Sequence, residues 1–321
     1  MKMRWLEPVP LLALLVAYGC GALLPVESGP ATVEASRSPA EAPIPLPNAE
    51  DSFRFVVLGD FGTGGTRQYE VAAEMARFRE SFAFDVVVTV GDNLYGAEKS
   101  RDFQKKFETP YKPLLDAGVT FYATLGNHDS REQRFYELFN MNGDYYYTFK
   151  APDRPVRFFM IDSTYRTPEE FVWLEKELQG ADDDWKIAVF HHPLYSSGGR
   201  HGSDKDLRRI LEPLFVTYNV SVAFSGHDHF YERLEPQLGV VYFVVGSGGK
   251  LAPGDIDRRS GLTARGYDRD NVFLAVEIAG DRMYFNAVTR GGHIVDSGII
   301  ERRLPAVAAT ESAPGGVSAP E

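Results

Sequence analysis

The chain has 321 residues, 44% of them hydrophobic and 25% charged, which is ordinary for a globular protein of one large or two smaller domains. Its net charge of −11 argues against nucleic acid as a partner, because binding a phosphate backbone requires a basic surface. Cys20 is the only cysteine, which excludes disulfides and thiolate metal sites from the folded part and leaves oxygen and imidazole as metal ligands.

The N-terminus has the pattern of an export signal. A basic start with Lys2 and Arg4 precedes an apolar run at residues 11–17 that is too short to span a bilayer. The run ends in AYGC at residues 17–20, which resembles a bacterial lipobox; the alternative is a plain signal peptide followed by a chance cysteine. We therefore expect a lipoprotein-type signal at residues 1–20. The protein would be exported from a bacterial cell to the periplasm or cell surface, with a lipid on Cys20 as its only link to the membrane.

Composition divides the rest of the chain into three parts. Residues 21–50 are rich in Pro, Ala, Ser and Glu without an apolar period, which is typical of a disordered tether. Residues 305–321 have a similar composition and are expected to be a disordered tail. Residues 51–304 contain no linker or repeat and are expected to form one folded domain.

The first part of this domain alternates between apolar strands and amphipathic helices. Thr167, Pro168 and Glu170 predict a helix start, with Thr167 as N-cap and Glu170 completing a capping box. Strands are expected at residues 53–58, 84–90, 120–125, 156–161, 186–190 and 220–224, and helices at 66–79, 101–115, 168–178 and 204–216.

The later part reads as antiparallel strands joined by short links, at residues 240–245, 272–278, 282–288 and 294–300. Residues 246–271 are expected to be a long functional or mobile loop. Strand–helix alternation in the first part of the domain and consecutive strands in the later part predict an α/β fold. In this fold two mixed β-sheets pack face to face with helices outside, as a four-layer α/β/β/α sandwich.

Five short motifs follow these predicted strands, and they read GDFG (59–62), GDNLY (91–95), GNHD (126–129), FHHP (190–193) and GHDH (226–229). Ligands of open α/β sheets gather at the carboxyl ends of strands, and the glycines allow the sharp turn needed there. A single Asp at a strand end often only caps a helix. The complete set predicts a two-metal site and metal-assisted hydrolysis of a phosphate ester.

The motifs resemble those of calcineurin-like metallophosphoesterases, and within that superfamily those of purple acid phosphatases of the tartrate-resistant type, over residues 51–303. Most superfamily members carry His two residues after the first-motif Asp; here that residue is Gly62, and Tyr95 replaces the lost ligand as in purple acid phosphatases. The resemblance implies two metal ions. It implies that Asp60, Tyr95 and His229 hold one ion, that Asn127, His191 and His227 hold the other, and that Asp92 bridges them.

Ligand chemistry and the resemblance also suggest the identity of the ions and the catalytic groups. A phenolate suits iron(III), while Asn with two imidazoles suits a divalent ion such as iron, zinc or manganese. The resemblance implies that His128 faces the phosphate as proton donor or electrostatic stabiliser, with Asp129 orienting it. It implies His201 as a second phosphate-facing group. His192 is either a hydrogen-bonding wall of the site or a packing residue.

Three functions remain open. The first is hydrolysis of small phosphate monoesters, in which a metal-bound hydroxide attacks phosphorus and His128 protonates the leaving oxygen. The second is a phosphodiesterase or nucleotide hydrolase with a di-manganese or di-zinc centre, in which the loop at 246–271 closes over a larger substrate. The third is a non-catalytic surface protein that binds phosphate. The second hypothesis would use the arginines of that loop, Arg258, Arg259, Arg265 and Arg269.

Overall fold

A computed structural model of the chain describes residues 33–34, 42–181 and 184–304. The expected signal with Cys20, most of the expected tether and the expected tail at 305–321 lie outside the described residues. Among the residues that are described, no helix has the length and apolar character needed to cross a bilayer.

Two seven-stranded sheets form the centre of the molecule. In the first sheet β2, β3 and β4 are parallel, and in the second β6, β7, β8 and β10 are parallel, while antiparallel strands complete both sheets. The first sheet has the order β1 (Val33–Glu34), β14 (Ile294–Glu301), β13 (Arg282–Thr289), β12 (Val272–Ala279), β2 (Phe53–Leu58), β3 (Val86–Thr89) and β4 (Thr120–Ala123). The second has the order β11 (Thr263–Tyr267), β9 (Tyr231–Leu234), β10 (Val241–Val245), β8 (Val222–Ser225), β7 (Trp185–Val189), β6 (Val156–Met160) and β5 (Tyr147–Lys150).

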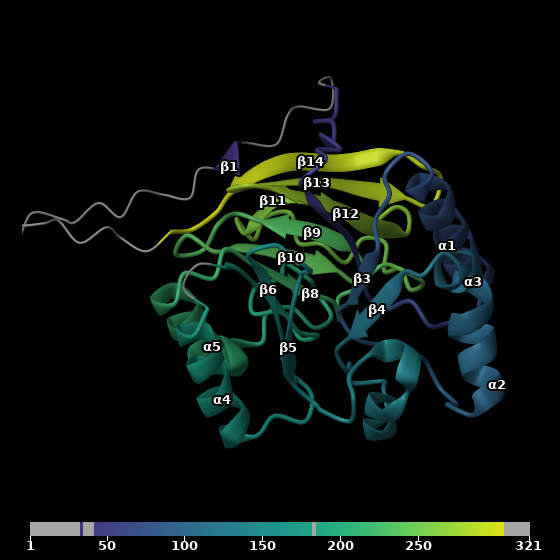
Figure 1. Cartoon of the computed structure of the whole chain (residues 1–321), viewed down its shortest axis with the longest axis horizontal. Coiled ribbons are helices and arrows are strands. Elements are labelled where there is room, and N and C mark those ends of the chain that lie inside the picture. The colour runs from purple at the N-terminus through teal and green to yellow at the C-terminus, as the bar shows by residue number, and fades with distance from the viewer. Residues whose placement is uncertain (1–32, 35–41, 182–183, 305–321) are drawn as a thin grey trace, which may run out of the picture.

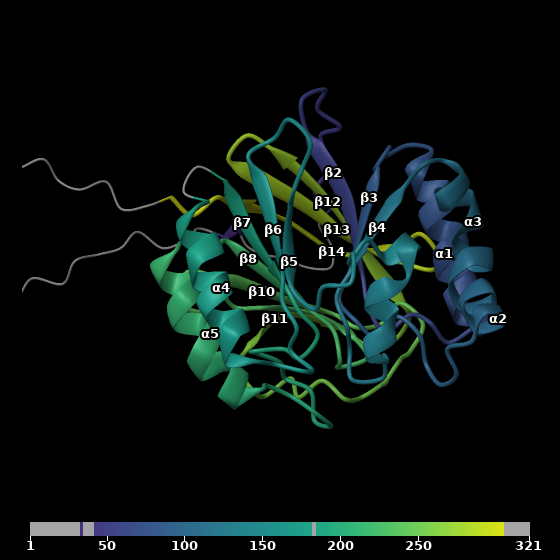
Figure 2. The ribbon, with the colours of Figure 1, turned by 60° about the horizontal axis from the view of Figure 1, so that its bottom comes forward.

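Helices cover the outer face of each sheet (Figures 1 and 2). Strand β2 shows why, because it is apolar on both faces: Phe55 and Val57 pack between the sheets, while Val56 and Leu58 pack in the cluster under the helices. The predicted four-layer α/β/β/α sandwich is therefore confirmed. The first sheet carries α1 (Thr66–Arg79), α2 (Ser100–Phe103), a π-helical turn (Gln104–Glu108) and α3 (Thr109–Asp116), and the second carries α4 (Pro168–Gln179) and α5 (Lys205–Thr217). Two short 3₁₀ turns, Arg131–Phe135 and Glu137–Phe139, follow β4.

Two segments differ from the sequence-based expectations. The expected loop at 246–271 contains β11, which pairs with β9 and lacks the apolar alternation that identifies a strand. Residues 42–50, expected to belong to the disordered tether, lie on the first sheet. Ile44 N donates to Ser297 Oγ at 2.9 Å, and the backbone amides of Asn48 and Ala49 donate to Glu277 at 2.8 and 2.7 Å. The ordered chain therefore extends N-terminal of residue 51, because Glu277 and Ser297 provide acceptors for its backbone.

A buried ion pair joins the two sheets. Arg233 of β9 donates from Nε to Asp296 Oδ2 of β14 at 2.8 Å, and the hydroxyl of Tyr231 donates to the same oxygen at 2.8 Å. Since both partners are buried and hydrogen-bonded, the contact fixes one sheet relative to the other. That relation matters because the functional site is built from both sheets.

Candidate metal centre

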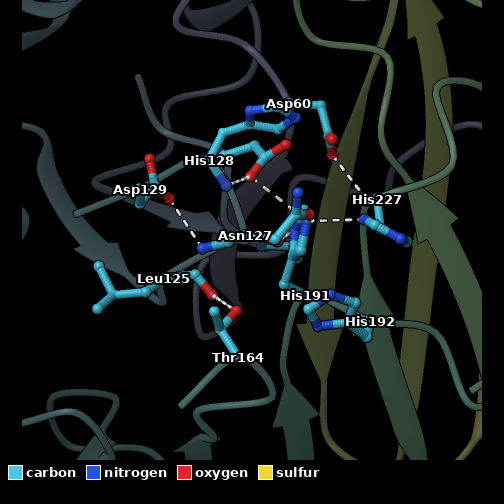
Figure 3. A network of polar contacts seen from close by, with 12 residues as sticks. Asp60, Leu125, Asn127, His128, Asp129, Thr164, His191, His192 and His227 are labelled. Atoms are coloured by element: carbon cyan, nitrogen blue, oxygen red, sulfur yellow. Dashed lines mark hydrogen bonds and ion pairs between the residues drawn. The ribbon is translucent and has the colours of Figure 1, made fainter. Parts of the chain in front are cut away.

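The residues predicted as metal ligands all follow the carboxyl ends of strands. Figure 3 shows Asp60, Asn127, His191 and His227 close together. The first sheet supplies Asp60 after β2, Asp92 and Tyr95 after β3, and Asn127 after β4. The second sheet supplies His191 after β7 and His227 and His229 after β8. The site therefore spans both sheets, as expected for ligands at strand ends.

One group of donor atoms surrounds the Tyr95 hydroxyl. Tyr95 Oη lies 3.1 Å from Asp60 Oδ1 and 3.3 Å from His229 Nε2, and the last two atoms lie 3.4 Å apart. Oxygen and nitrogen ligands sit about 2.0–2.2 Å from a metal ion, which places neighbouring ligands about 3–3.5 Å from each other. The three atoms are therefore spaced as ligands of a single ion.

A second group surrounds the ring of His191. Its Nε2 lies 2.9 Å from Asn127 Oδ1, 3.2 Å from His227 Nδ1 and 3.4 Å from Asp92 Oδ1. Asp92 also belongs to a cluster with Asp60 and His229 in which all donor atoms lie within 4.8 Å of one another. Asp92 Oδ2 is buried and, among the described residues, has no hydrogen-bond partner. An orphaned carboxylate oxygen between two donor groups fits a cation, so the residues present suit a two-metal centre.

The electrostatics of the site also fit cations. Burial raises the pKa of Asp60 well above its usual value, and burial with the nearby charges of Asp60 and Asp92 raises that of Tyr95. Burial and the neighbouring histidines lower the pKa of His227 to about 2. Neutral imidazole is the form that binds metal, while a buried carboxylate or phenolate needs a positive partner. The protein therefore provides ligands whose charged forms a bound metal ion would stabilise.

The backbone is shaped to bring these side chains inward. Asp60, Asp92 and His227 adopt φ angles of 54°, 51° and 71°, which are uncommon for residues other than glycine and typical of functional turns. A Cβ atom on Gly126 would lie 2.2 Å from Asp92 Oδ1, and one on Gly226 would lie 2.4 Å from Asp60 Oδ2. Glycine is therefore required where the motifs pack against each other's carboxylates.

His128 lies at the exposed mouth of the site. Its backbone N–H donates to Asp92 Oδ1 at 2.9 Å, and its ring centroid is 4.8 Å from that of Tyr95. His201 is also exposed, with its ring centroid 4.1 Å from that of His227. The two histidines predicted to face the phosphate thus border different donor groups, His128 the Tyr95 group and His201 the His191 group.

Asp129 has a different role from the expected one of orienting His128. Its buried carboxylate accepts backbone hydrogen bonds from Asn93, Leu94 and Gly126 at 3.0, 3.0 and 2.8 Å. Among the described residues, its hydrogen bonds go to these loops and to side chains beside them, not to the His128 ring. Asp129 therefore ties the GDNLY turn to the GNHD turn, and it supports the site by holding two ligand-bearing loops together.

Three supporting residues were not identified from the sequence. Asn93 donates from Nδ2 to Thr124 O at 2.9 Å and to Asp129 Oδ2 at 3.1 Å, inside the same network. Ser163 Oγ accepts from the backbone N–H groups of His191 and His192. Lys250 places its ammonium 4.3 Å from the centroid of the Tyr95 ring. Asn93 could have been identified from the sequence, since it lies within the GDNLY motif. Ser163 and Lys250 come close to the site only through long-range folding.

Comparisons with known proteins agree with this geometry. The model of the family described as calcineurin-like phosphoesterase matches residues 53–231. Tartrate-resistant acid phosphatase type 5 of Mus musculus is 28% identical over 243 residues, covering 63% of this chain and 74% of that protein.

Two solved structures share the fold. Purple acid phosphatase PPD1 from yellow lupin superposes with a TM-score of 0.67 at 19% identity, covering 86% of this chain and 58% of that one. Plasmodium GAP50, described as an anchor in the inner membrane complex, superposes with a TM-score of 0.68 at 21% identity, covering 79% and 90%. The chain therefore belongs to the calcineurin-like phosphoesterase family, is similar within it to the purple acid phosphatases, and is a metal-dependent hydrolase of phosphoric esters.

Proposed function

We propose that the protein hydrolyses small phosphate monoesters at a centre of iron(III) and a divalent iron, zinc or manganese ion. Asp60, Tyr95 and His229 would hold iron(III), and Asn127, His191 and His227 the divalent ion, with Asp92 facing both. The proposal rests on the position of the Tyr95 hydroxyl, which lies 3.1 Å from Asp60 Oδ1 and 3.3 Å from His229 Nε2. A phenolate is a hard anionic donor, which suits a trivalent ion.

The chain's own residues then perform the remaining tasks. When bound, the two ions polarise the phosphate and activate water. His128 beside Tyr95 is placed to donate a proton to the leaving oxygen, and its hydrogen bond to Asp92 keeps it next to the ligands. His201 beside His227 supports the phosphate from the other donor group. Neither histidine is buried, so a substrate has access to both.

The diesterase alternative depended on arginines of residues 246–271 reaching over the site. Arg258 instead pairs with Asp268 at 3.2 Å, Arg259 with Asp257 at 3.3 Å, and Arg265 donates from Nε to Val295 O at 2.8 Å. These contacts keep Arg258 and Arg259 within their own segment and Arg265 against β14, so these three arginines give no support to this alternative. The phosphate-binding alternative is not favoured either, because the sequence lacks none of the ligands that the resemblance implies.

A substrate panel tests the proposal. The metal-replete protein would be assayed with p-nitrophenyl phosphate and with bis(p-nitrophenyl) phosphate, with Asp92→Asn as the control that removes a donor charge shared by both groups. We expect kcat/KM for the monoester to exceed that for the diester by roughly 10-fold or more, and Asp92→Asn to lose most of either activity. A preference for the diester would show that the substrates are phosphodiesters and not phosphate monoesters. No hydrolysis of either compound would support the binding protein.

We also propose that the protein is exported and lipidated on Cys20, on the grounds of the N-terminal sequence alone. In a bacterial host, the wild type would partition into the detergent phase and incorporate labelled fatty acid. Cys20→Ser would do neither. Equal labelling of the two proteins would contradict lipidation at this residue.

A further inference from the structure

The segment that follows β10 is seated directly on the metal-ligand loops. Gly249 N and Lys250 N donate to the carbonyl oxygen of Asp60 at 3.1 and 3.0 Å, and Ala252 N donates to that of His229 at 2.9 Å. A Cβ atom on Gly249 would lie 2.1 Å from the carbonyl oxygen of Phe61, so only glycine allows this approach. The backbone of residues 249–252 is therefore hydrogen-bonded to Asp60 and His229, two of the three residues in the Tyr95 group.

The side chain of Lys250 reaches the third donor. Its Nζ lies 4.3 Å from the centroid of the Tyr95 ring, within the range of a cation–π contact. Residues 249–252 thus contact Asp60, His229 and Tyr95, and the ammonium group of Lys250 lies beside the Tyr95 ring.

In the described part of the chain, this ammonium forms no ion pair with a carboxylate. Within residues 42–181 and 184–304, no carboxylate lies within 4.0 Å of Lys250 Nζ, although the chain as a whole carries a net charge of −11. Lysine side chains at a surface usually extend into water, whereas this one is half-buried over an aromatic ring. A positive charge that is held in place and left unpaired at the mouth of a site is suited to bind an anion.

We propose that Lys250 binds an anionic oxygen of the substrate phosphate on the Tyr95 side of the site and so contributes to substrate affinity. The inference rests on the proposed phosphatase function and deepens it by adding a fixed cation to the two phosphate-facing histidines. It differs from a structural role, in which Lys250 would only pack on Tyr95 and support the metal ligands. The two roles give different results when the charge is removed and the aliphatic stem is kept.

The test measures binding of inorganic phosphate to the metal-replete protein by calorimetry, together with metal content and steady-state kinetics. Lys250→Met removes the charge and keeps the stem, and Lys250→Arg restores a cation. Lys112→Met is the matched control, because Lys112 is exposed on α3, where it pairs with Asp116 at 2.7 Å. We expect Lys250→Met to bind phosphate about 10-fold more weakly and to raise KM more than it lowers kcat. Lys250→Arg should recover most of the affinity, and Lys112→Met should match the wild type.

The other outcomes contradict the inference in distinguishable ways. If Lys250→Met binds phosphate as the wild type does, Lys250 is not a phosphate-binding residue, while the proposed phosphatase function stands. If Lys250→Met loses metal, the residue supports the metal ligands and does not bind the substrate. If Lys250→Arg fails to restore binding at full metal content, a positive charge at this position does not bind phosphate. If the wild type neither binds phosphate nor hydrolyses monoesters, the proposed function itself fails.

Discussion

Nδ1 of His191 lies 2.9 Å from the carbonyl oxygen of Val90, so the first sheet orients a proposed metal ligand that the second sheet supplies. A carbonyl oxygen only accepts hydrogen bonds, and therefore Nδ1 carries the proton and Nε2 keeps its lone pair. That lone pair faces Asn127 Oδ1 and His227 Nδ1, at 2.9 and 3.2 Å. Such a contact behind a metal-binding histidine sets both the tautomer and the direction of the ring.

The neighbouring His192 is held in the opposite tautomer. Ser163 Oγ accepts the backbone N–H groups of His191 and His192 at 3.1 and 2.9 Å, so its own proton is directed to His192 Nδ1 at 3.0 Å. Nε2 of His192 then carries a proton and is not available to a metal ion. His192 therefore lines the site and is held in place by its hydrogen bond with Ser163.

This difference predicts different metal contents for two adjacent variants. Elemental analysis of the purified proteins should show that His191→Ala loses about one equivalent of metal, because a ligand with a free lone pair is removed. His192→Ala should keep both equivalents. Equal losses in the two variants would contradict the tautomer assignment.

His128→Ala should lower kcat by about 10²–10³-fold while the metal content stays the same, because His128 contributes a proton donor but no metal ligand. The measurement is steady-state hydrolysis of p-nitrophenyl phosphate alongside elemental analysis. His293→Ala, which removes a histidine in the turn between β13 and β14, is the control. Near-normal turnover in His128→Ala would show that the proton comes from elsewhere.

Asp129→Ala should destabilise the fold, because it leaves the buried amides of Asn93, Leu94 and Gly126 without their acceptor. We expect the free energy of unfolding to fall by about 2–4 kcal/mol, measured by urea denaturation of the metal-free protein. Asp116→Ala, on the exposed end of α3, is the matched control and should change it by less than about 1 kcal/mol. A similar small loss for Asp129→Ala would mean that the two turns do not depend on this carboxylate.

Glu170 gives a prediction on pH dependence. Burial raises its pKa to about 8 from a usual value of 4.5, and its Oε2 has no partner among the described residues. The folded state therefore binds more protons at this position than the unfolded state between these values, and its stability falls as pH rises through that window. Glu170→Gln keeps the acceptor for the backbone N–H of Asp162 without the charge.

The free energy of unfolding of Glu170→Gln, relative to that of the wild type, should increase by about 1–3 kcal/mol from pH 5 to pH 9. Chemical denaturation at the two pH values measures this difference. Glu169→Gln on the same first helical turn is the control and should show no such gain. If the stability difference between Glu170→Gln and the wild type is the same at both pH values, the carboxyl group does not titrate as inferred.

The sequence predicted the elements whose pattern is local. Helix α1 has the predicted bounds of residues 66–79, and Thr167 caps α4 as expected, accepting a hydrogen bond from Glu170 N. The predicted ligands meet because their motifs follow the carboxyl ends of strands in both sheets. The rule that ligands gather at these ends applies without knowledge of the side-chain contacts.

Features that depend on distant partners could not be read from the sequence. Strand β11 is polar and becomes a strand only by pairing with β9. The side chain of Glu170 bonds Asp162 N instead of completing the predicted capping box, because the turn after β6 lies against the start of α4. Asp129 was expected to serve His128, yet three backbone amides from two turns surround its carboxylate. No local pattern encodes such long-range contacts.

The visible absorption spectrum of the purified, unreduced, metal-loaded protein, with Tyr95→Phe beside it, tests the central claim most directly. The 3.1 Å and 3.3 Å contacts of Tyr95 Oη with Asp60 and His229 predict a tyrosinate–iron(III) bond. The account therefore predicts a purple to pink wild type whose visible band is absent from Tyr95→Phe. A wild type that contains two metal equivalents and is colourless, or a coloured Tyr95→Phe, would contradict the assignment of iron(III) to the Tyr95 group.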